Sequence, residues 1–543
     1  MSAVATASAH DLAPAVPARR RTLNPWIIAL AVVVPTFMEV LDTTIANVAL
    51  RYIAGGLSAT VSDGEWVITS YLAANAIILP LTGWISAHLG RRRYFLISIA
   101  VFTLASMLCG MATSLGQLIF FRVLQGLAGG GLQPSSQGVL LDSFPQEKQG
   151  SAMTLFGIAA LIAPILGPTL GGWITDHYSW RWIFYINGPV GLLALGACAA
   201  VLKDPDYLVK EREELKKKPL NFDSIGLGLL VITMVCWEVL LSKGQEWDWF
   251  GDSFGRVQVL GSLFGLGLVA LIWRELTIAA PVVNFRPLAE RNLASVSIIT
   301  FCAFGVLYGS TTMLPGLLQS LFGYDATHSG LVMSPAGIAS VMFLPIIGGL
   351  LGRGTDARWM IGAGLITMSI GNYWMAQMNL DMSPRQVIWP RIVMIVGLSS
   401  MFAPLNVAAY IYTPQRLRGA AIGLVSLLRN EGGSVGTSLA QTLQERRTIF
   451  HGTRLVDQLD PLNPAVTSFS HDSLPAFVQQ TGDPVSAQQM VWQNLEGLRQ
   501  QQASALGFFD TFWFFAILGF SLVLLIPLMK RSVAEKGAHI SAE

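Results

Sequence analysis

Two carboxylic acids stand inside the first strongly hydrophobic segment of the chain, in the stretch FMEVLDTTIANVAL at residues 37–50. Placing one carboxylate in the hydrocarbon of a bilayer costs about 2.5–3.5 kcal/mol on insertion scales. Glu39 and Asp42 are three residues apart, so in a helix they lie on the same face. Because that face needs a proton, a partner or a cavity, we predict that it lines a path through the protein.

An arginine in another hydrophobic segment is the predicted partner of Asp42. Asp42 lies about five residues from the outer end of its segment and Arg122 about six from the outer start of the 116–140 segment, so their depths agree within a few ångströms. Burial favours the neutral form of Asp42, whereas Arg122 favours the ionised form. The pair therefore suits proton uptake and release. The alternative is that Arg122 extends alone to the outer surface.

The composition indicates a membrane protein with many spans. Of the 543 residues, 52% are hydrophobic and 13% are charged, about half the charged share of a soluble protein. A spanning helix needs about 20 apolar residues, and the sequence predicts an all-α fold with fourteen such helices. The predicted spans are 25–47, 66–86, 94–113, 116–140, 151–175, 182–202, 222–242, 254–273, 293–320, 330–351, 360–378, 384–410, 419–441 and 506–529.

The domain organisation follows from charge placement and a weak internal repeat. Most Lys and Arg fall in connections on one side, which predicts that both termini are cytoplasmic. Pro80-x-x-Gly83 recurs as Pro345-x-x-Gly348, as expected for a transporter built from repeats. The predicted parts are a cytoplasmic tail 1–24, a six-helix bundle 25–202, a cytoplasmic connector 203–221, two additional helices 222–273, a second six-helix bundle 274–530 and a cytoplasmic tail 531–543. The second bundle contains a long external loop, 442–505, which we interpret as either a partner-docking element or a flexible insertion.

The loop after the second segment reads GWISAHLGRRR, and it resembles the cytoplasmic loop motif G-x-x-x-D-R-x-G-R-R of the major facilitator superfamily. Gly83, Gly90, Arg91 and Arg92 match that motif and are implied to form a gating loop. Ala87 stands where the family usually has Asp, so the usual acidic partner of the arginines is missing from the motif.

The fifth segment reads GIAALIAPILGPTLGG, a pattern of proline and glycine that bends a helix and permits close packing. It is also similar to the antiporter motif of drug exporters. With the LDTTIANVAL stretch and the fourth-segment R-x-x-Q-G, it makes the chain resemble the 14-helix drug:proton antiporters of EmrB/QacA type. The implied hinge residues are Gly157, Pro164, Gly167, Pro168, Gly171 and Gly172.

This resemblance implies a proton-coupled multidrug efflux transporter in a bacterial inner membrane. It exports hydrophobic or amphipathic molecules in exchange for protons, with proton coupling at Asp42, Glu39 and Arg122. EmrB-like relatives imply a membrane-fusion adaptor and an outer-membrane channel as partners, whereas QacA-like relatives act alone. Other polar residues are expected on a substrate path or in structural roles: Asn47, Gln125, Arg391, Arg429 and Glu431. Glu238 is expected near the membrane surface.

Other classes of protein are less consistent with the sequence. Neither a catalytic constellation nor a nucleotide-binding G-x(4)-G-K-[ST] is present, so we expect no enzyme, no cofactor and no ATP-driven pump. The four cysteines lack the spacing of a metal site, and no nucleic acid partner is expected. The remaining alternatives are a proton symporter that imports a metabolite and a sensor or scaffold without transport.

Overall fold

The computed structural model describes residues 24–217, 223–278 and 281–533, and within these ranges the chain is helical without any strand. The predicted tails, 1–24 and 531–543, and the end of the connector lie mostly outside the described residues. Within the described ranges, eleven helices are long and apolar enough to cross a membrane, or twelve if the two arms of the bent α7 are one span. Each of the fourteen predicted spans is helical, although α15 and α17 are not among those twelve. A count of exactly fourteen spans stays a prediction.

The first bundle contains six spans, and two of them are each divided into two helices. The predicted 116–140 helix is two helices because the chain breaks at Gly130 and Gly131, and the predicted 182–202 helix breaks at Ile186. The helices are α1 (Pro25–Gly56), α2 (Val61–Gly64), α3 (Trp66–Leu89), α4 (Arg91–Met111), α5 (Leu115–Gly129), α6 (Leu132–Ser143), α7 (Gln146–His177), α8 (Trp182–Tyr185) and α9 (Asn187–Val201).

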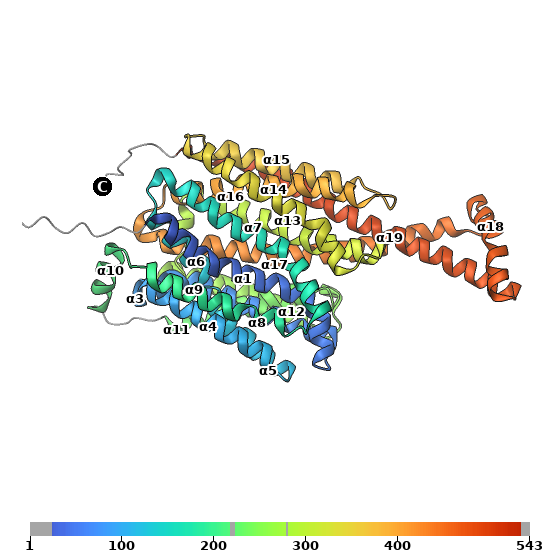
Figure 1. The fold of residues 1–543 in the computed structure, drawn as a ribbon, viewed down its shortest axis with the longest axis horizontal. Helices are drawn as coiled ribbons and strands as arrows, with labels where there is room; N and C mark the ends of the chain where they lie inside the picture. Colours follow the sequence, from blue (N-terminus) through green and yellow to red (C-terminus); the bar gives the residue numbers. More distant parts are fainter. Residues whose placement is uncertain (1–23, 218–222, 279–280, 534–543) are drawn as a thin grey trace, which may run out of the picture.

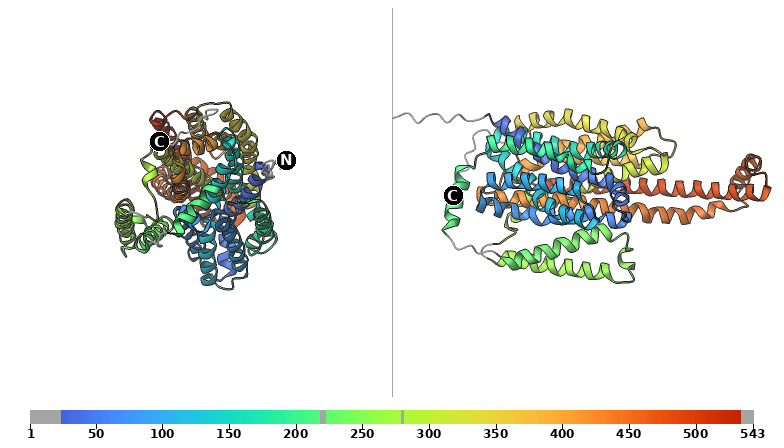
Figure 2. Two further views of the ribbon diagram at one scale, coloured as in Figure 1. Left: turned by 90° about the vertical axis from the view of Figure 1, so that its left-hand side faces the viewer. Right: turned by 60° about the horizontal axis from the view of Figure 1, so that its bottom comes forward.

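Between the bundles lie α10 (Asp206–Lys216) and an additional helix pair, α11 (Ser224–Lys243) and α12 (Arg256–Thr277). Asp223 caps α11 by accepting from the Gly226 N–H and pairs with Arg274 of α12 at 2.6 Å. The additional pair is central in the sequence but lies on the outside of the molecule, beside the bundles (Figure 2). It packs on α3 and on α17.

The second bundle is built from α13 to α17 and α19. Its helices are α13 (Arg291–Phe322), α14 (Ala326–Gly352), α15 (Ala357–Ala376), α16 (Pro384–Tyr410), α17 (Gln415–Val456), α18 (Pro464–Thr481) and α19 (Pro484–Leu522); short 3₁₀ turns lie at Trp249–Gly251, Arg286–Ala289, Asp457–Leu459 and Val523–Leu528. The two bundles meet where α7 packs on α14 and α16 and where α17 packs on α3. The described chain ends and α10 lie at one end of the molecule (Figure 1).

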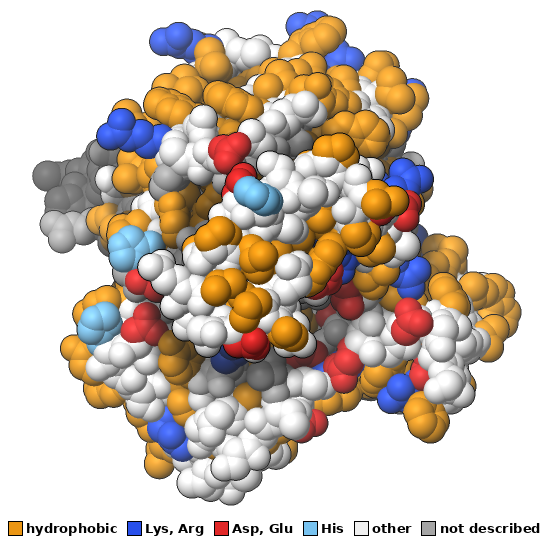
Figure 3. Space-filling view, turned by 90° about the vertical axis from the view of Figure 1, so that its right-hand side faces the viewer, with side chains coloured by type: hydrophobic (Ala, Val, Ile, Leu, Met, Phe, Trp, Pro, Cys, Tyr) orange, Lys and Arg blue, Asp and Glu red, His pale blue; other side chains and the backbone are white. Residues whose placement is uncertain are grey.

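The segment 442–505, expected as a loop, is a helical hairpin at the opposite end of the molecule (Figure 1). Two of its prolines begin helices, because Pro464 and Pro484 stand in the first turns of α18 and α19, where proline fits. Helix α17 has 42 residues and so is about 63 Å long, twice the hydrocarbon thickness of about 30 Å. Hydrophobic side chains lie exposed among polar ones on the face that carries the hairpin (Figure 3).

Helices α13 and α17 of the second bundle approach each other closely at glycines. A β-carbon at Gly436 would lie 2.1 Å from the carbonyl oxygen of Gly305, and one at Gly432 would lie 2.1 Å from that of Phe301. Only glycine permits this approach, in the manner of membrane helix pairs with small residues at their interface. The crossing fixes α17, which carries Arg429 and Glu431.

We predict that Gly436→Val destabilises the fold by about 1–3 kcal/mol, because the added side chain overpacks the α13–α17 crossing. Thermal unfolding of the detergent-solubilised protein measures this effect as a lower midpoint. Gly349→Val is the matched control, since a β-carbon at Gly349 meets nothing within 4 Å. Equal midpoints for the two variants would contradict the prediction.

Candidate functional site

Asp42 of α1 and Arg122 of α5 form an ion pair in the interior of the first bundle. Arg122 Nη1 lies 2.6 Å from Asp42 Oδ2, and the two residues are only 0% and 3% exposed, respectively. The depth argument from the sequence thus describes the observed geometry, whereas a role in proton transfer stays a prediction. Ion pairs this deeply buried persist only when further hydrogen bonds satisfy both partners.

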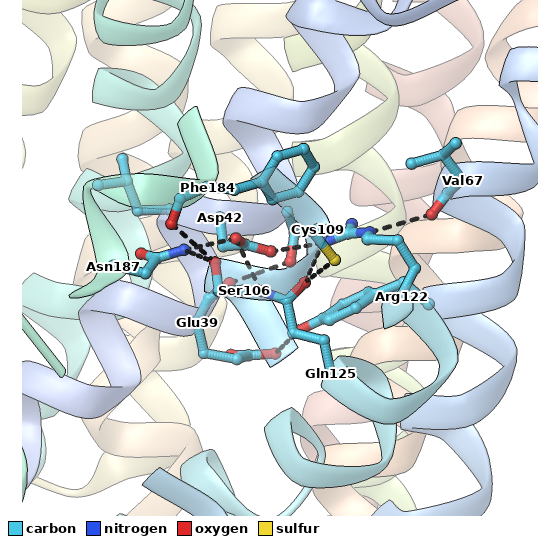
Figure 4. Close-up of polar contacts among 12 residues, drawn as sticks. Glu39, Asp42, Val67, Ser106, Cys109, Arg122, Gln125, Phe184 and Asn187 are labelled. Atoms are coloured by element: carbon cyan, nitrogen blue, oxygen red, sulfur yellow. Dashed lines mark hydrogen bonds and ion pairs between the residues drawn. The ribbon is translucent and has the colours of Figure 1, made fainter. Parts of the chain in front are cut away.

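Three side chains supply those hydrogen bonds around Asp42 (Figure 4). The second carboxylate oxygen, Oδ1, accepts from Gln125 Nε2 at 2.9 Å and from Asn187 Nδ2 at 2.6 Å. Gln125 Oε1 accepts from Arg122 Nη1 at 2.9 Å, so the amide bridges both charges. Asn187 is held in turn by Ser106, whose hydroxyl accepts from it at 2.9 Å. Asp42 is therefore bound by donors from two other helices, Arg122 and Gln125 of α5 and Asn187 of α9.

The Arg122 guanidinium is further held by the backbone and by aromatic faces. Its Nε donates to the Val67 carbonyl at 3.1 Å. The Tyr71 ring centroid lies 4.2 Å from its central carbon and that of Phe184 lies 5.6 Å away. A cation over an aromatic face in a dry site gains about 2 kcal/mol, so the rings stabilise the cation where no water reaches it.

Glu39 lies one helical turn from Asp42 and faces a different set of donors. Its carboxylate accepts from Tyr71 Oη at 3.2 Å, Asn75 Nδ2 at 3.2 Å and Gln133 Nε2 at 2.7 Å. Tyr71 thus joins the two carboxyl groups, because it bonds to Glu39 while its ring covers Arg122. No ion pair involves Glu39 among the described residues, so its three partners are all uncharged.

Glu39 lines a narrow cavity between the two bundles. The room left for solvent is about 20 Å³, enough for one or two water molecules, so the bundles are closed around the site. Its walls come from both halves of the chain: Glu39, Val40, Asn75, Leu79, Gly129, Gly130, Gln133, Ala160, Phe304, Tyr308, Ser426, Arg429 and Asn430.

Arg429 of α17 faces Glu39 across this cavity. Its Nη1 donates to Gln133 Oε1 at 3.3 Å, so Gln133 bridges Glu39 and Arg429. Three phenyl rings surround the guanidinium at 5.3–5.8 Å, those of Phe156, Phe304 and Phe402. No ion pair involves Arg429 among the described residues. Aromatic faces and an amide therefore take the place of a carboxylate.

The other expected path residues do not meet at this cavity. Asn47 is exposed, because five helical positions turn it away from the face of Asp42. Arg391 donates to the hydroxyls of Ser310 and Thr311 at 3.1 and 2.6 Å and has no acidic partner among the described residues. Glu431 and Arg429 form no ion pair with each other, as their spacing indicates, and Glu431 points to α11 instead.

The arginines of the GWISAHLGRRR loop pair with acidic residues that lie outside the motif. Arg91 pairs with Asp142 at the end of α6, and its Nη2 donates to Tyr207 Oη at 3.3 Å. The Arg92 N–H donates to Asp204 at 2.7 Å. Gly90 has a φ of 89°, a left-handed conformation that favours glycine, and a β-carbon there would lie 2.6 Å from Asp204. Asp142 and Asp204 thus take the place of the motif Asp that Ala87 replaces.

Gly83, the first residue of the loop motif, lies where the bundles meet. A β-carbon on Gly83 of α3 would lie 3.0 Å from the carbonyl carbon of Gly419 at the start of α17. Bulk at this position would separate α3 from α17. The loop motif thus contributes both to an ion pair within the first bundle, at Arg91, and to a contact between the bundles, at Gly83.

The proline- and glycine-rich helix α7 contacts both halves. It bends by 41° between its arms, Lys148–Pro164 and Leu166–His177. Gly157, in the first arm, packs against Phe402 of α16. Gly167 and Gly171, in the second arm with Pro168 and Gly172, pack against Thr44 and Ile45 of α1. Both arms contact the second bundle, since Thr169 of the second arm packs against Gly330 of α14, and the second arm also contacts the Asp42 helix.

The sequence argument missed several polar residues of the site. Tyr71, Asn75, Ser106, Gln133 and Asn187 bind the two carboxyl groups directly or through one partner. The sequence carries one signal for them, since each is a polar residue inside an otherwise apolar segment. Glu238 was expected near the membrane surface, which stays a prediction; within the protein it is only 2% exposed, because α17 covers it.

Comparisons with known proteins give one consistent family. The model of the Major Facilitator Superfamily matches residues 32–437. The multidrug export protein EmrB of Haemophilus influenzae is 39% identical over 446 residues, which are 82% of this chain and 85% of that protein. EmrB of Escherichia coli is 35% identical over 473 residues, covering 86% and 90% of the two chains.

A solved structure supports the fold. The structure of the proton:xylose symporter XylE bound to 6-bromo-6-deoxy-D-glucose superposes with a TM-score of 0.56 at 12% identity and covers 92% of this chain and 94% of that chain. At this identity the likeness concerns the fold alone.

We predict a strong energetic coupling between Asp42 and Arg122. Arg122→Gln and Asp42→Asn each remove one partner of a buried pair and are expected to cost about 3–5 kcal/mol, whereas the double variant costs less than their sum. Unfolding in detergent measures the three variants, with the exposed Arg385→Gln as a control. Additive effects would show that the two groups do not stabilise each other.

Proposed function

The chain belongs to the major facilitator superfamily, in the group of the EmrB-type multidrug export proteins, and from this we propose that it is a drug:proton antiporter. It exports hydrophobic or amphipathic small molecules across a bacterial inner membrane and does not alter them chemically. The printed names of the EmrB relatives support export. The observation that carries the proton coupling is the buried pair of Asp42 and Arg122.

In the proposed cycle Asp42 exchanges one proton with the two sides of the membrane in turn. When Asp42 is ionised, Arg122, Gln125 and Asn187 bind it and hold α1 to the neighbouring helices. Protonation removes the charge that Arg122 neutralises, so the ion pair weakens and α1 can shift against α5. Each proton that crosses the membrane supplies about 2.3 kcal/mol per 100 mV of membrane potential.

The substrate path in this proposal is the cavity between Glu39 and Arg429. Its phenyl rings suit apolar molecules, and its amides and charges suit polar groups on them. Because the present cavity holds little more than water, substrate enters only after the bundles separate. The bend in α7 serves as the hinge, and the contacts of Gly83 and Arg91 close the α10 end.

The proposed orientation places the α10 end in the cytoplasm. The arginines Arg91 and Arg92 lie at this end, as do both described chain ends, and positive charge is retained on the cytoplasmic side. The helical hairpin then extends from the outer face of the inner membrane.

The hairpin suits the docking of a membrane-fusion adaptor, the partner that leads to an outer-membrane channel. It extends beyond the bundles, and α18 is held on α19 by a small apolar cluster of Val466, Val491 and Leu495. Near its tip, Leu462 and Val485 remain 87% and 68% exposed. Apolar side chains left in water beside a rigid hairpin are typical of an interaction surface.

We predict that Asp42→Asn abolishes coupling. In proteoliposomes, the wild type moves protons opposite to the drug, and the variant reduces this flux to that of empty liposomes because residue 42 no longer binds a proton. A pH-sensitive dye records the flux at equal amounts of monodisperse protein. Asp381→Asn, a matched change in an exposed loop, retains the flux. Protons moving with the drug would instead identify a symporter.

We also predict that charged residues at the hairpin tip abolish drug resistance in cells without affecting transport in proteoliposomes. Leu462→Asp with Val485→Asp retains antiport in proteoliposomes but loses drug resistance in intact cells, because adaptor docking fails. Ser468→Asp adds a charge at an exposed position of α18 and serves as the control. Undiminished resistance in cells would exclude the tip as a docking surface.

A further inference from the structure

A second pair of carboxyl groups is buried away from the Asp42 cluster, where the additional helix pair meets the second bundle. Glu238 of α11 is 2% exposed and Glu431 of α17 is 5% exposed. The two side chains face each other where α11 packs on α17, since Ser434, three residues after Glu431 on the same face of α17, hydrogen-bonds to Glu238. Glu238 stands five residues before the end of α11, about 7.5 Å inside it, so the pair lies within the span and not at its surface.

The surroundings of the pair are polar only at a few points. Ser434 Oγ donates to Glu238 Oε1 at 3.1 Å, and the Trp237 indole reaches Glu431. Neither carboxylate oxygen of Glu431 accepts a hydrogen bond from an N–H or O–H donor in the described part of the chain. Phe264 of α12 stacks on Trp237 with ring centroids 4.4 Å apart. Both helices of the additional pair thus contribute to the enclosure.

The charged groups on the helices packed against α11 and α17 are engaged elsewhere. No ion pair among the described residues includes Glu238 or Glu431. The neighbouring titratable groups and their partners are Lys243 with Glu65 and Glu246, Arg256 with Asp252, Arg274 with Asp223, Glu275 with the Val283 N–H, Asp510 with Arg447 and His451, Glu445 with Gln245, Arg429 with Gln133, Tyr71 with Glu39, and Tyr308, which packs at Gly433.

Two carboxylates cannot both be ionised at this distance without a cation, since like charges that share a dry site repel strongly. A hydrogen bond between them requires that one be a carboxylic acid, whose O–H donates to the other. We propose that Glu238 and Glu431 form a second proton-binding site, which holds one proton between them and exchanges another as the pair passes between its singly and doubly protonated forms.

The site connects proton binding to the position of α17. At the outer end, Gln245 donates to Glu445 at 2.8 Å and the Trp249 indole to Thr442 at 3.1 Å, so α17 is also held to the additional pair there. A shift of α17 along α11 separates the two carboxyl groups and removes the O–H donor that stabilises the ionised partner. Its role in transport rests on the proposed antiport, whereas proton binding itself does not.

Direct counting of bound protons tests the site without any transport step. The purified protein in detergent is titrated with acid and base, and the protons bound per molecule are compared for wild type, Glu238→Gln, Glu431→Gln and the double variant. In each variant the remaining carboxyl group, if any, is alone in a dry site and stays neutral. We therefore expect all three variants to exchange about one proton fewer than wild type, without additivity.

Two further variants keep the test decisive. Glu445→Gln makes the same chemical change on the exposed part of α17. It loses only the proton that an exposed carboxyl group exchanges at acidic pH and retains the buried exchangeable proton. If the glutamine variants prove unstable, Glu238→Asp takes their place. It keeps a carboxyl group but shortens the side chain by one methylene, so the pH at which the pair exchanges its proton shifts. An unchanged count in both single glutamine variants, a loss of two protons in the double variant, or no shift in Glu238→Asp would overturn the proposal. If the proton counts agree with these expectations but drug drives no proton flux, only the proposed antiport is overturned.

Discussion

The cost of placing charge in hydrocarbon is the constraint on which this architecture depends. Asp42 and Arg122 each cost several kcal/mol when buried alone. They are accommodated because five helices, α1, α3, α5, α4 and α9, converge to supply Gln125, Asn187 and aromatic or backbone partners. The network satisfies Asp42 fully and leaves Arg122 Nη2 without a hydrogen-bond partner among the described residues. In the proposed cycle it holds α1 while Asp42 is ionised and weakens once a proton neutralises the acid.

Buried arginines have different kinds of partner in the two halves of the molecule. The first half pairs its arginine with an acid, whereas Arg429 in the second half is covered by three phenyl rings and one amide and Arg391 by two hydroxyls. A cation without a fixed counter-charge remains available to a polar group that enters the cavity. Gln133 links the two arrangements, since it binds Glu39 in one half and Arg429 in the other.

Much of this arrangement could be predicted because it depends on helical depth and periodicity. The pairing of Asp42 with Arg122 follows from counting residues along two helices, and the helical spans follow from apolar length. The partners Asn187 and Gln133 could not be predicted, because their positions depend on how helices pack across the bundle. The burial of Glu238 could not be predicted for the same reason, since no property of α11 alone reveals that α17 covers it. The segment 442–505 was expected as an external loop because it lies between two apolar spans, whereas its helices α18 and α19 begin at Pro464 and Pro484, where proline fits.

The central claim is that Asp42 carries the proton that drug binding displaces. Infrared difference spectroscopy of the purified protein, recorded on adding drug, detects the carbonyl stretch of a carboxylic acid that ionises. The account predicts a loss of this band that disappears in Asp42→Asn and remains in Glu39→Gln, whose carboxyl group lies one turn away on the same helix. A wild-type band loss that persists unchanged in Asp42→Asn would contradict it.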